Sequence, residues 1–433
     1  MNSLKISIAG LGTVGSSLIE LIESNKDRIQ NRINKKIIIS GICAKNKNKK
    51  RNFSIDKYQW FDDPINMINE TNPDIFIELM GYEKDVSYDS IKLSLEKKIN
   101  VITANKALIA HYGNELVSIS DNNKTNFLFE ASVAGAIPII KSLKSLLFGN
   151  KIIKLSGILN GTTNYILTNM SKNKVSFNEA LNDAKNKGYV EANPDLDIEG
   201  LDSAHKLSII SSLAFSSKFK EFSLIYKEGI SKIDSIDIDF AEKLNFVIKL
   251  LAVSEIKNNK LFQYVKPLLI DKNFQIAQVN GVLNGIQIIT KESGNFFLEG
   301  AGAGGYATSS SIVSDIAEIS LNSFTPALGI NFEILDNLEH FQFEDQYGSF
   351  YIRLNVLDKP GVLASITSEF KNNDISIETM IQNPLKDSSH PKILPLIFTT
   401  HETYLKNINK CIERIINIQS VKHKPVVIQI YKV

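Results

Sequence analysis

The order of apolar and polar residues along this chain predicts an α/β protein. Leu4–Ala9 is a short apolar run, typical of a buried strand, and a helical apolar period follows between Leu18 and Ile22. Further strand-like runs occur at Ile37–Ala44, Asp74–Met80 and Asn100–Thr103, and segments long enough for helices separate them. Strands that alternate with helices are expected to form a parallel sheet.

The last part of the chain has a pattern of its own. From Phe350 to Val356 apolar and polar residues alternate, which predicts a half-buried strand. Asp358-Lys359-Pro360-Gly361 then predicts a turn into a helix over Val362–Phe370. The elements expected after it are strands at Ile375–Ile381, Ile393–Thr400 and Val426–Tyr431, with a helix over Leu405–Ile418. This repeated β-α-β pattern indicates a separate C-terminal domain.

A glycine-rich loop separates the first strand from the first helix. It reads Gly10-Leu11-Gly12-Thr13-Val14-Gly15. In such a loop the first glycine permits a tight turn, the second lets a pyrophosphate approach the backbone, and the third allows close helix packing. The helix N-terminus attracts the anion. We therefore expect dinucleotide binding here, the alternative being merely a tight turn.

The residues after the second strand bear on the choice of dinucleotide. An NAD-selective site places an acidic residue there, whereas this chain has Lys45, Asn46 and Lys47, with Arg51 nearby. Cations at this position favour the 2′-phosphate of NADP. Lysine is abundant throughout the chain, so NAD stays an alternative.

Composition excludes several other classes of protein. The 433 residues are 43% hydrophobic, which is enough for two or three domains with real cores. The 49 basic and 47 acidic residues give a net charge of only +2, so no basic field indicates nucleic-acid binding. No apolar run is long enough for a membrane span. The two distant cysteines, Cys43 and Cys411, fit a reducing compartment, and we expect a cytoplasmic protein.

The segment from Gly188 to Lys206 carries the densest candidate chemistry. It gathers five carboxylates and a lysine around Pro194 and the start of an apolar helix. Asp202 and Lys206 are four residues apart, so both project from one face of that helix. Carboxylates there could receive a substrate ammonium, while the lysine could pass a proton to an oxygen. A solvated acidic turn with an ordinary helix ion pair is the structural alternative.

Three other loops contribute candidates. Lys106 follows the strand at Asn100–Thr103, and the carboxyl ends of parallel strands face the ligand crevice, so it is expected near the nicotinamide. The small-residue loop after Glu130 could offer backbone carbonyls to a hard cation, or be small for packing alone. In the loop around Gly161, Thr162 could bind an anionic substrate group or simply cap a helix.

His205 stands next to Lys206 and invites a catalytic interpretation. A helix neighbour points about a hundred degrees away, so we expect His205 to be a packed histidine and not a general base.

Together these motifs resemble homoserine dehydrogenase. The resemblance rests on GLGTVG, TANKAL, EASVAGAIP, GILNGTTNYIL, GYVEANPDLDIEGLDSAHK and GAGAGGYATSSSIVSD, which occur in the family's order between residue 10 and about residue 320. It implies the reversible NAD(P)-dependent reduction of L-aspartate 4-semialdehyde to L-homoserine, on the route to threonine and methionine. Asn193 replaces a frequent aspartate of the family and Ala307 a frequent proline, but neither is a predicted catalytic group.

The resemblance implies a role for each matching residue. Lys206 would donate a proton to the substrate carbonyl oxygen, Asp202 would bond that oxygen or the lysine, and Lys106 would stand near nicotinamide and substrate. The substrate shell would comprise Glu191, Asp197, Thr162 and Gly161. The cofactor would contact Gly10, Gly12, Thr13, Val14, Gly15, Lys45, Lys106, Gly188 and Gly304. A sodium site would comprise Glu130 with the carbonyls of Val133, Gly135 and Ile137.

The C-terminal pattern from Ser349 onward resembles an ACT domain, a ferredoxin-like fold. In that family the DKPGVL loop commonly forms an amino-acid site at a dimer interface, which implies feedback inhibition by threonine. The alternative is a dimerising module that has lost its ligand. The resemblance to homoserine dehydrogenase also implies a homodimer or homotetramer.

We therefore expect three domains in a monofunctional enzyme. These are a Rossmann dinucleotide-binding domain over residues 1–130, rejoined by about 305–335, a central α+β substrate and dimerisation domain over 131–304, and the ACT domain over 349–433. Two other functions stay open from the sequence: a non-catalytic sensor that binds NADP and an amino acid, and a reductase of another amino-acid semialdehyde.

Overall fold

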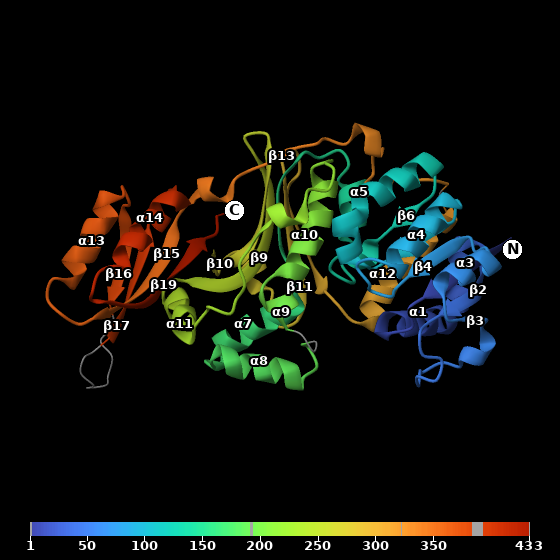
Figure 1. Cartoon of the computed structure of the whole chain (residues 1–433), viewed down its shortest axis with the longest axis horizontal. Coiled ribbons are helices and arrows are strands. Elements are labelled where there is room, and N and C mark those ends of the chain that lie inside the picture. Colours follow the sequence, from blue (N-terminus) through green and yellow to red (C-terminus); the bar gives the residue numbers. More distant parts are fainter. Residues whose placement is uncertain (1, 191–193, 322, 383–392, 433) are drawn as a thin grey trace.

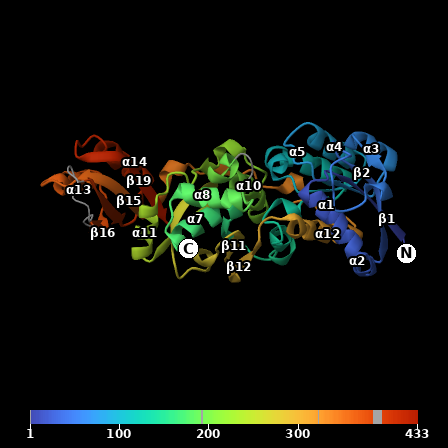
Figure 2. The same ribbon diagram turned by 90° about the horizontal axis from the view of Figure 1, so that it is seen from below.

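The protein is elongated, with its N-terminal, middle and C-terminal parts in a row (Figures 1 and 2). The computed structural model describes residues 2–190, 194–321, 323–382 and 393–432. None of the helices within these ranges is long and apolar enough to cross a membrane. The α/β class expected from the sequence is confirmed.

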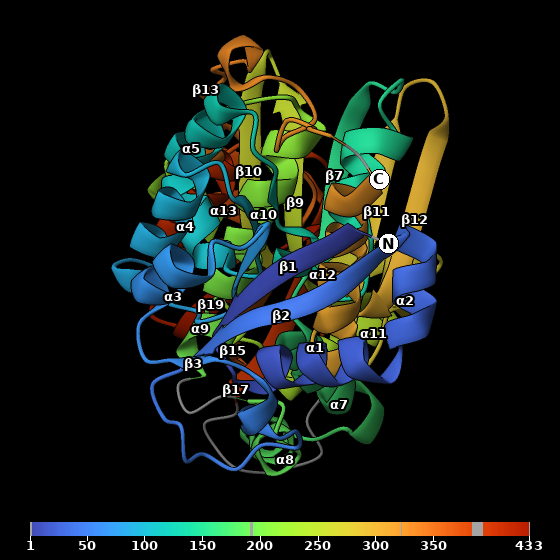
Figure 3. The same ribbon diagram turned by 90° about the vertical axis from the view of Figure 1, so that its right-hand side faces the viewer.

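The N-terminal part is built on a six-stranded parallel sheet. Its order is β3 (Trp60–Phe61), β2 (Lys35–Cys43), β1 (Asn2–Ala9), β4 (Ile75–Glu78), β5 (Asn100–Thr103) and β6 (Phe127–Leu128). The helices between them are α1 (Thr13–Ser24), α2 (Lys26–Ile33), α3 (Pro64–Thr71), α4 (Val86–Glu96) and α5 (Lys106–Asn123). The end-on view shows α1 and α2 on one side of β1 and β2, with α3 and α4 on the other (Figure 3). The strand order reverses at β1 and β4, which is where such sheets bind ligands.

A helix from much later in the chain completes this part. Helix α12 (Gly305–Leu321) lies beside α1 (Figure 2). A Cβ atom on Gly305 would come within 2.2 Å of Ser17 Oγ, so the close approach of the two helices requires glycine. The Ser309 hydroxyl donates to the Val14 carbonyl at 3.1 Å. The domain boundaries, including the rejoining segment at about 305–335, stay a prediction.

The middle part consists of an antiparallel sheet covered by helices. Its strands run in the order β12 (Gly294–Ala301), β11 (Leu283–Thr290), β7 (Ile152–Ile158), β9 (Phe246–Lys257) and β10 (Lys260–Asp271). The helices are α7 (Gly161–Asn173), α8 (Phe177–Asn186), α9 (Asp195–Ile198), α10 (Leu201–Ala214) and α11 (Ser235–Lys243). Shorter elements of this part are α6 (Ile139–Lys141), β8 (Tyr226–Lys227) and β13 (Glu339–His340). Strands β14 (Tyr347–Gly348) and β18 (Thr403–Tyr404) pair with each other in a separate two-stranded sheet. Leu155 of β7 and Leu207 of α10 are among the fully buried residues of this core.

The C-terminal part has a four-stranded antiparallel sheet and two helices. The sheet order is β19 (Val421–Ile430), β15 (Phe350–Leu357), β17 (Ile393–Thr400) and β16 (Ile377–Gln382). Helices α13 (Val362–Asn372) and α14 (Leu405–Ile415) pack against each other. Because β17 lies between β15 and β16, the unit has the split β-α-β topology of ferredoxin-like folds. This agrees with the expected fold.

The middle and C-terminal sheets form one continuous sheet. Strand β10 pairs in parallel with β19, with Leu268 opposite Gln429 and Leu269 opposite Ile430. On α11, fully buried Asp237 accepts hydrogen bonds from Arg353 Nε at 2.6 Å and Nη2 at 2.9 Å. The Tyr351 hydroxyl donates to the same carboxylate at 3.0 Å. A short strand pairing and a buried ion pair thus hold the two parts together.

Candidate active site

The glycine loop has the shape that a bound pyrophosphate needs. Gly10 has φ of +99°, and a Cβ atom there would lie 2.3 Å from the Leu79 carbonyl oxygen. A Cβ on Gly15 would lie 1.9 Å from the Gly10 carbonyl oxygen. At Gly12, by contrast, a Cβ would meet no described atom within 4 Å. Two glycines therefore fold the loop tightly, while Gly12 leaves open space beside the α1 N-terminus, where Thr13 and Val14 begin the helix.

Two of the predicted cations near the second strand have separate tasks. Lys45 follows the end of β2, and its ammonium lies 4.7 Å from the ring centroid of Tyr82. The Arg51 guanidinium instead donates to the carbonyls of Asn46, Lys47 and Lys49 at 2.8 to 3.2 Å. Arg51 therefore shapes its own loop, and Lys45 is the better candidate for contact with a phosphate.

Lys206 and Asp202 form a close ion pair on α10. Their Nζ and Oδ2 atoms are 2.6 Å apart, as the four-residue spacing predicts. Lys206 Nζ also donates to the Leu159 carbonyl at 2.7 Å. The Lys206 side chain is 11% exposed. Since an ammonium carries three protons and these two acceptors take two among the described residues, a third proton can reach a ligand oxygen.

Lys106 joins this pair from the N-terminal part. It begins α5, and its ammonium lies 3.3 Å from Asp202 Oδ1. Asn105 caps α5 by accepting a hydrogen bond from the Leu108 N–H, which fixes where the helix starts. Asp202 thus stands between two ammonium groups from different parts of the chain.

Asn160 organises the carboxylates, and its role was not expected from the sequence. Its side-chain amide donates to Asp197 Oδ1 at 2.7 Å and to Asp202 Oδ2 at 2.9 Å. Its amide oxygen accepts the Thr163 N–H at 2.8 Å and so caps α7. The one sequence feature that could have indicated this role is an asparagine in the short connection between β7 and α7. One residue therefore anchors a helix and sets the spacing of two acidic groups.

The pKa values of Asp197 and Asp202 are shifted in opposite directions from that of a free aspartate. Burial acts to raise the pKa of Asp202, but the charges of Lys206 and Lys106 outweigh it and hold this pKa well below its usual range. Burial raises the pKa of Asp197, and the charge of Asp202 adds to the rise. Separated pKa values of neighbouring carboxyl groups are typical of sites with divided chemical roles.

The remaining substrate candidates lie around the α7 N-terminus. The Thr162 hydroxyl donates to the Tyr189 carbonyl at 2.7 Å. A Cβ on Gly161 would lie 2.6 Å from the Val282 carbonyl oxygen, so glycine is required for packing there. Gly188 has φ of +72° after α8, directly before Tyr189. Glu191 lies outside the described residues, as does Asn193.

The later cofactor candidate, Gly304, precedes α12 and has φ of +124°. A side chain would be strained at that angle. Because α12 packs on α1, Gly304 belongs to the same region of the fold as the glycine loop.

Glu130 lies in a buried turn with an unusual backbone. Its carboxylate accepts the N–H groups of Ile140 at 2.9 Å and Lys141 at 2.8 Å. Burial and the nearby Asp315 raise its pKa to about 7. The Gly135 carbonyl accepts the Ser311 hydroxyl at 2.7 Å, and the Ile137 carbonyl accepts the Ile139 N–H at 2.8 Å. Each of these two carbonyls keeps a second lone pair, and carbonyl and carboxylate oxygens are the kind of ligand that a hard cation binds.

The His205 ring packs against aromatic side chains and not against the Lys206–Asp202 ion pair. It stacks on Phe222, with ring centroids 4.3 Å apart, and the His111 ring lies 5.5 Å away. Burial, together with the charges of His111 and Lys106, lowers its pKa to about 4. His205 is therefore a packed, neutral imidazole.

Replacing His205 by glutamine should leave the pH profile of any turnover unchanged between pH 5 and 9. It should also improve stability in acid. As pH falls, the unfolded chain takes up the proton near pH 6.5 but the folded chain only near pH 4, so the wild type loses stability across this range. Urea unfolding at pH 7 and at pH 4.5 would measure the difference. A new ionisation in the pH profile of the variant would contradict this assignment.

The arrangement can protonate an oxygen next to a bound dinucleotide. Lys206 offers a proton from a buried position, Asp202 and the Leu159 carbonyl fix its direction, and Lys106 adds positive charge where an oxyanion would develop. Asp197 can accept hydrogen bonds from a cationic amine. This combination fits reduction of a carbonyl in a molecule that also carries an ammonium group.

Comparison with known proteins agrees with this chemistry. Residues 10–130 match the family model of the homoserine dehydrogenase NAD-binding domain, 138–317 that of homoserine dehydrogenase, and 350–417 that of the ACT domain. Homoserine dehydrogenase of Helicobacter pylori is 37% identical over 99% of both chains. A solved homoserine dehydrogenase of Thiobacillus denitrificans superposes with a TM-score of 0.91 at 31% identity, covering 100% of this chain and 99% of the other. A hyperthermophilic archaeal homoserine dehydrogenase, solved as a mutant with NADPH, covers 74% of this chain and 98% of its own at 27% identity and a TM-score of 0.62.

Proposed function

This chain belongs to the homoserine dehydrogenase family, and we propose that Lys206 is the proton donor of its reaction. The reaction interconverts L-aspartate 4-semialdehyde and L-homoserine with a nicotinamide cofactor. Support for the role comes chiefly from the geometry of the Lys206 ammonium, which Asp202 and the Leu159 carbonyl hold at 2.6 and 2.7 Å. When bound, the reduced nicotinamide supplies the hydride.

In this proposal the other residues position the substrate. Asp197, with Glu191 and Thr162, binds the substrate ammonium and its neighbouring polar groups. Asp202 keeps Lys206 oriented, and Lys106 stabilises the negative charge that develops on the carbonyl oxygen. In the reverse direction, Lys206 takes the hydroxyl proton of homoserine as the alcohol is oxidised.

We propose NADP as the preferred dinucleotide, with Lys45 as the residue that selects it. Lys45 follows the second strand, where the ribose 2′ position lies in such folds. The NADPH named with the archaeal relative is consistent with this choice.

Reversing the charge of Lys45 should therefore discriminate between the cofactors. We expect Lys45→Glu to raise the KM for NADPH about tenfold, since roughly 1.4 kcal/mol of phosphate binding is lost. The KM for NADH should not rise. Lys36→Glu, at an exposed position of β2 itself, is the matched control and should leave both KM values unchanged. Equal effects on both cofactors would contradict the selective role.

We propose three further features for this chain. A monovalent cation such as sodium would be held by Glu130 and the carbonyls of Val133, Gly135 and Ile137; Ala134 and Gly135, both with φ of +53°, turn the backbone sharply there. The C-terminal ACT domain would bind threonine as an inhibitor in a homodimer or homotetramer. The buried thiols Cys43 and Cys411 fit a reducing compartment, for which we propose the cytoplasm.

A single assay tests the proposed function. NADPH or NADH is mixed with aspartate semialdehyde, with and without threonine, while the absorbance of the reduced nicotinamide is followed. We expect oxidation that depends on the semialdehyde, faster with NADPH and slower when threonine is added. Turnover without threonine is also measured in a sodium salt and in the salt of a large organic cation, to test the cation site. No oxidation of either cofactor would refute the proposal, and unchanged rates with threonine would refute only the regulation.

A further inference from the structure

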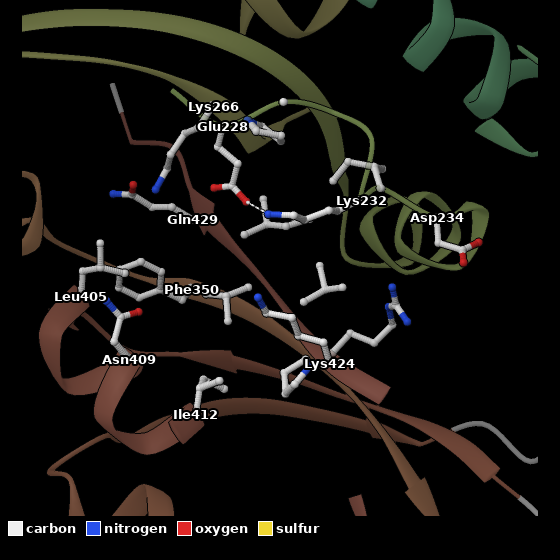
Figure 4. Close-up of a pocket in the computed structure, with 18 of the residues that line it drawn as sticks. Glu228, Lys232, Asp234, Lys266, Phe350, Leu405, Asn409, Ile412, Lys424 and Gln429 are labelled. Carbon is white, nitrogen blue, oxygen red and sulfur yellow. Dashed lines mark ion pairs between the residues drawn. The ribbon is translucent and has the colours of Figure 1, made fainter. Parts of the chain in front are cut away.

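A cavity of about 760 Å³ lies where the middle part meets the ACT domain. One wall is the loop that contains Glu228 and Lys232, together with Lys266 of β10. The opposite wall comes from α14, β15 and β19 of the ACT domain (Figure 4). The cavity borders the β10–β19 pairing that joins the two sheets, because Gln429 of that pairing also lines it. It is separate from the Pro-Gly turn at Pro360 and Gly361, and from the Lys206–Asp202 ion pair of α10.

Two buried polar groups in this cavity lack strong partners. Lys266 is 5% exposed, and its ammonium lies 3.4 Å from Gln346 Oε1 and 4.9 Å from the ring centroid of Phe343. No carboxylate of the described residues forms an ion pair with it within 4.0 Å. The Gln429 side chain is 8% exposed, and its Oε1 atom is buried without a described hydrogen-bond partner. Figure 4 shows these two side chains next to each other at one end of the cavity. Buried polar groups left in this state are destabilising unless something else bonds them.

Comparison with a second buried lysine shows how unusual Lys266 is. Lys249, on the neighbouring strand β9, is 3% exposed. Burial lowers the pKa of both lysines to about 7. Lys249, however, donates to Val279 O at 2.6 Å, Asn164 Oδ1 at 3.0 Å and Asn280 Oδ1 at 3.2 Å. The Lys249 ammonium thus has three hydrogen-bond acceptors, whereas the Lys266 ammonium has one long contact and lines the cavity.

The same end of the cavity also carries an acidic group. Figure 4 shows the Glu228 carboxylate beside the Lys266 and Gln429 side chains. Its ion-pair partner is Lys232 of the same loop, 4.0 Å away and largely exposed, which makes the pair weak. The Tyr226 hydroxyl donates to it at 3.4 Å. Apolar side chains lie further in, from Phe350, Leu405 and Ile412. The cavity therefore offers a cation, an anion and an apolar surface within a small space.

The cavity wall is bonded directly to the segment that carries the catalytic carboxylates. The Ile230 N–H donates to the Ile198 carbonyl at 3.0 Å, and the Ser231 hydroxyl donates to Glu199 at 3.0 Å. A Cβ atom on Gly229 would lie 2.5 Å from the Ile198 carbonyl oxygen, so the two backbones are in close contact. Ile198 and Glu199 stand between Asp197 and Asp202. The cavity wall is therefore in direct contact with the segment between these two carboxylates.

We infer that this cavity binds a free α-amino acid, with its carboxylate on Lys266 and its ammonium on Glu228, and that it is the regulatory site of the enzyme. A zwitterion supplies a carboxylate, which the Lys266 ammonium lacks among the described residues, and a cation for Glu228, while its side chain meets the apolar surface. The inference rests on the proposed amino-acid regulation and places its site at the domain junction, away from the Pro-Gly turn.

Calorimetric titration of the full chain tests this placement. The probes are L-threonine, L-isoleucine and L-methionine, together with N-acetyl-L-threonine and L-threoninamide, which lack the ammonium and the carboxylate respectively. At least one amino acid should bind, and its Kd should rise at least tenfold in Lys266→Met and in Glu228→Gln. Asp358→Ala in the turn should leave the Kd unchanged. Neither blocked threonine derivative should bind.

Turnover measurements complete the test. The amino acid that binds should inhibit the wild type but not Glu228→Gln, whose rate without amino acid should equal that of the wild type. If circular dichroism shows that Lys266→Met does not fold, the Kd and the inhibition measured in Glu228→Gln test the inference. The inference is overturned if no probe binds, if Asp358→Ala alone abolishes binding, or if inhibition persists in Glu228→Gln. Failure of the proposed catalysis is seen separately, as absent turnover without any amino acid.

Discussion

Replacing Lys206 by arginine should lower kcat by about 10²- to 10⁴-fold, the usual contribution of a positioned general acid. Arginine keeps the positive charge next to Asp202, but its pKa above about 12 prevents it from giving up a proton at neutral pH. Binding of homoserine should largely survive, because the residues proposed to hold its ammonium are unchanged. Kinetics with NADPH and calorimetric binding of homoserine would measure the two effects.

A matched control separates the catalytic role from a general effect of the substitution. Lys92→Arg makes the same change in an exposed ion pair, 2.8 Å from Glu115, and should leave kcat unchanged. Near-normal turnover of Lys206→Arg would rule out Lys206 as the proton donor. Loss of homoserine binding in parallel with kcat would instead assign Lys206 to holding the substrate.

Local features of this fold could be predicted well from the sequence. Strands β5 and β17 begin and end at the expected residues, since each is a short apolar run with clear boundaries. The Asp202–Lys206 contact was also predictable, because four residues on one helix fix the direction of both side chains. In these cases the determining interactions lie within a few residues of each other.

Features that depend on distant contacts could not be predicted in this way. Asn160 lies 37 residues from Asp197, and nothing near it in the sequence indicates that it bonds two carboxylates. Lys266 reads as one polar residue within an apolar strand, and its cavity exists only because β19 returns beside β10. The catalytic roles themselves came from the resemblance to a family and stay predictions until they are tested.

The buried pair between Asp237 and Arg353 should make the largest single contribution to stability that we predict. Asp237→Ala is expected to lower the free energy of unfolding by about 3–5 kcal/mol, the usual cost of removing one partner from a buried ion pair. The change leaves the guanidinium of Arg353, a residue that is 8% exposed, without the carboxylate that accepts two of its hydrogen bonds. Thermal and urea unfolding would measure the loss.

A neighbouring aspartate supplies the control. Asp239 lies on the same helix α11, but it is 51% exposed and pairs with exposed Lys174. Asp239→Ala should therefore cost less than about 1 kcal/mol. A similar small loss for Asp237→Ala would show that the buried pair does not hold the ACT domain to the middle part.

Removing both charges together distinguishes the attraction between them from the cost of leaving one unpaired. The double variant Asp237→Leu with Arg353→Met should be clearly more stable than Asp237→Ala, since no charge then stays buried alone. The Tyr351 hydroxyl would still lose its acceptor, at a cost of about 1–3 kcal/mol, so recovery should be incomplete. If the double variant were as unstable as Asp237→Ala, the loss would come from the missing attraction and hydrogen bonds of Asp237, and not from an unpaired Arg353.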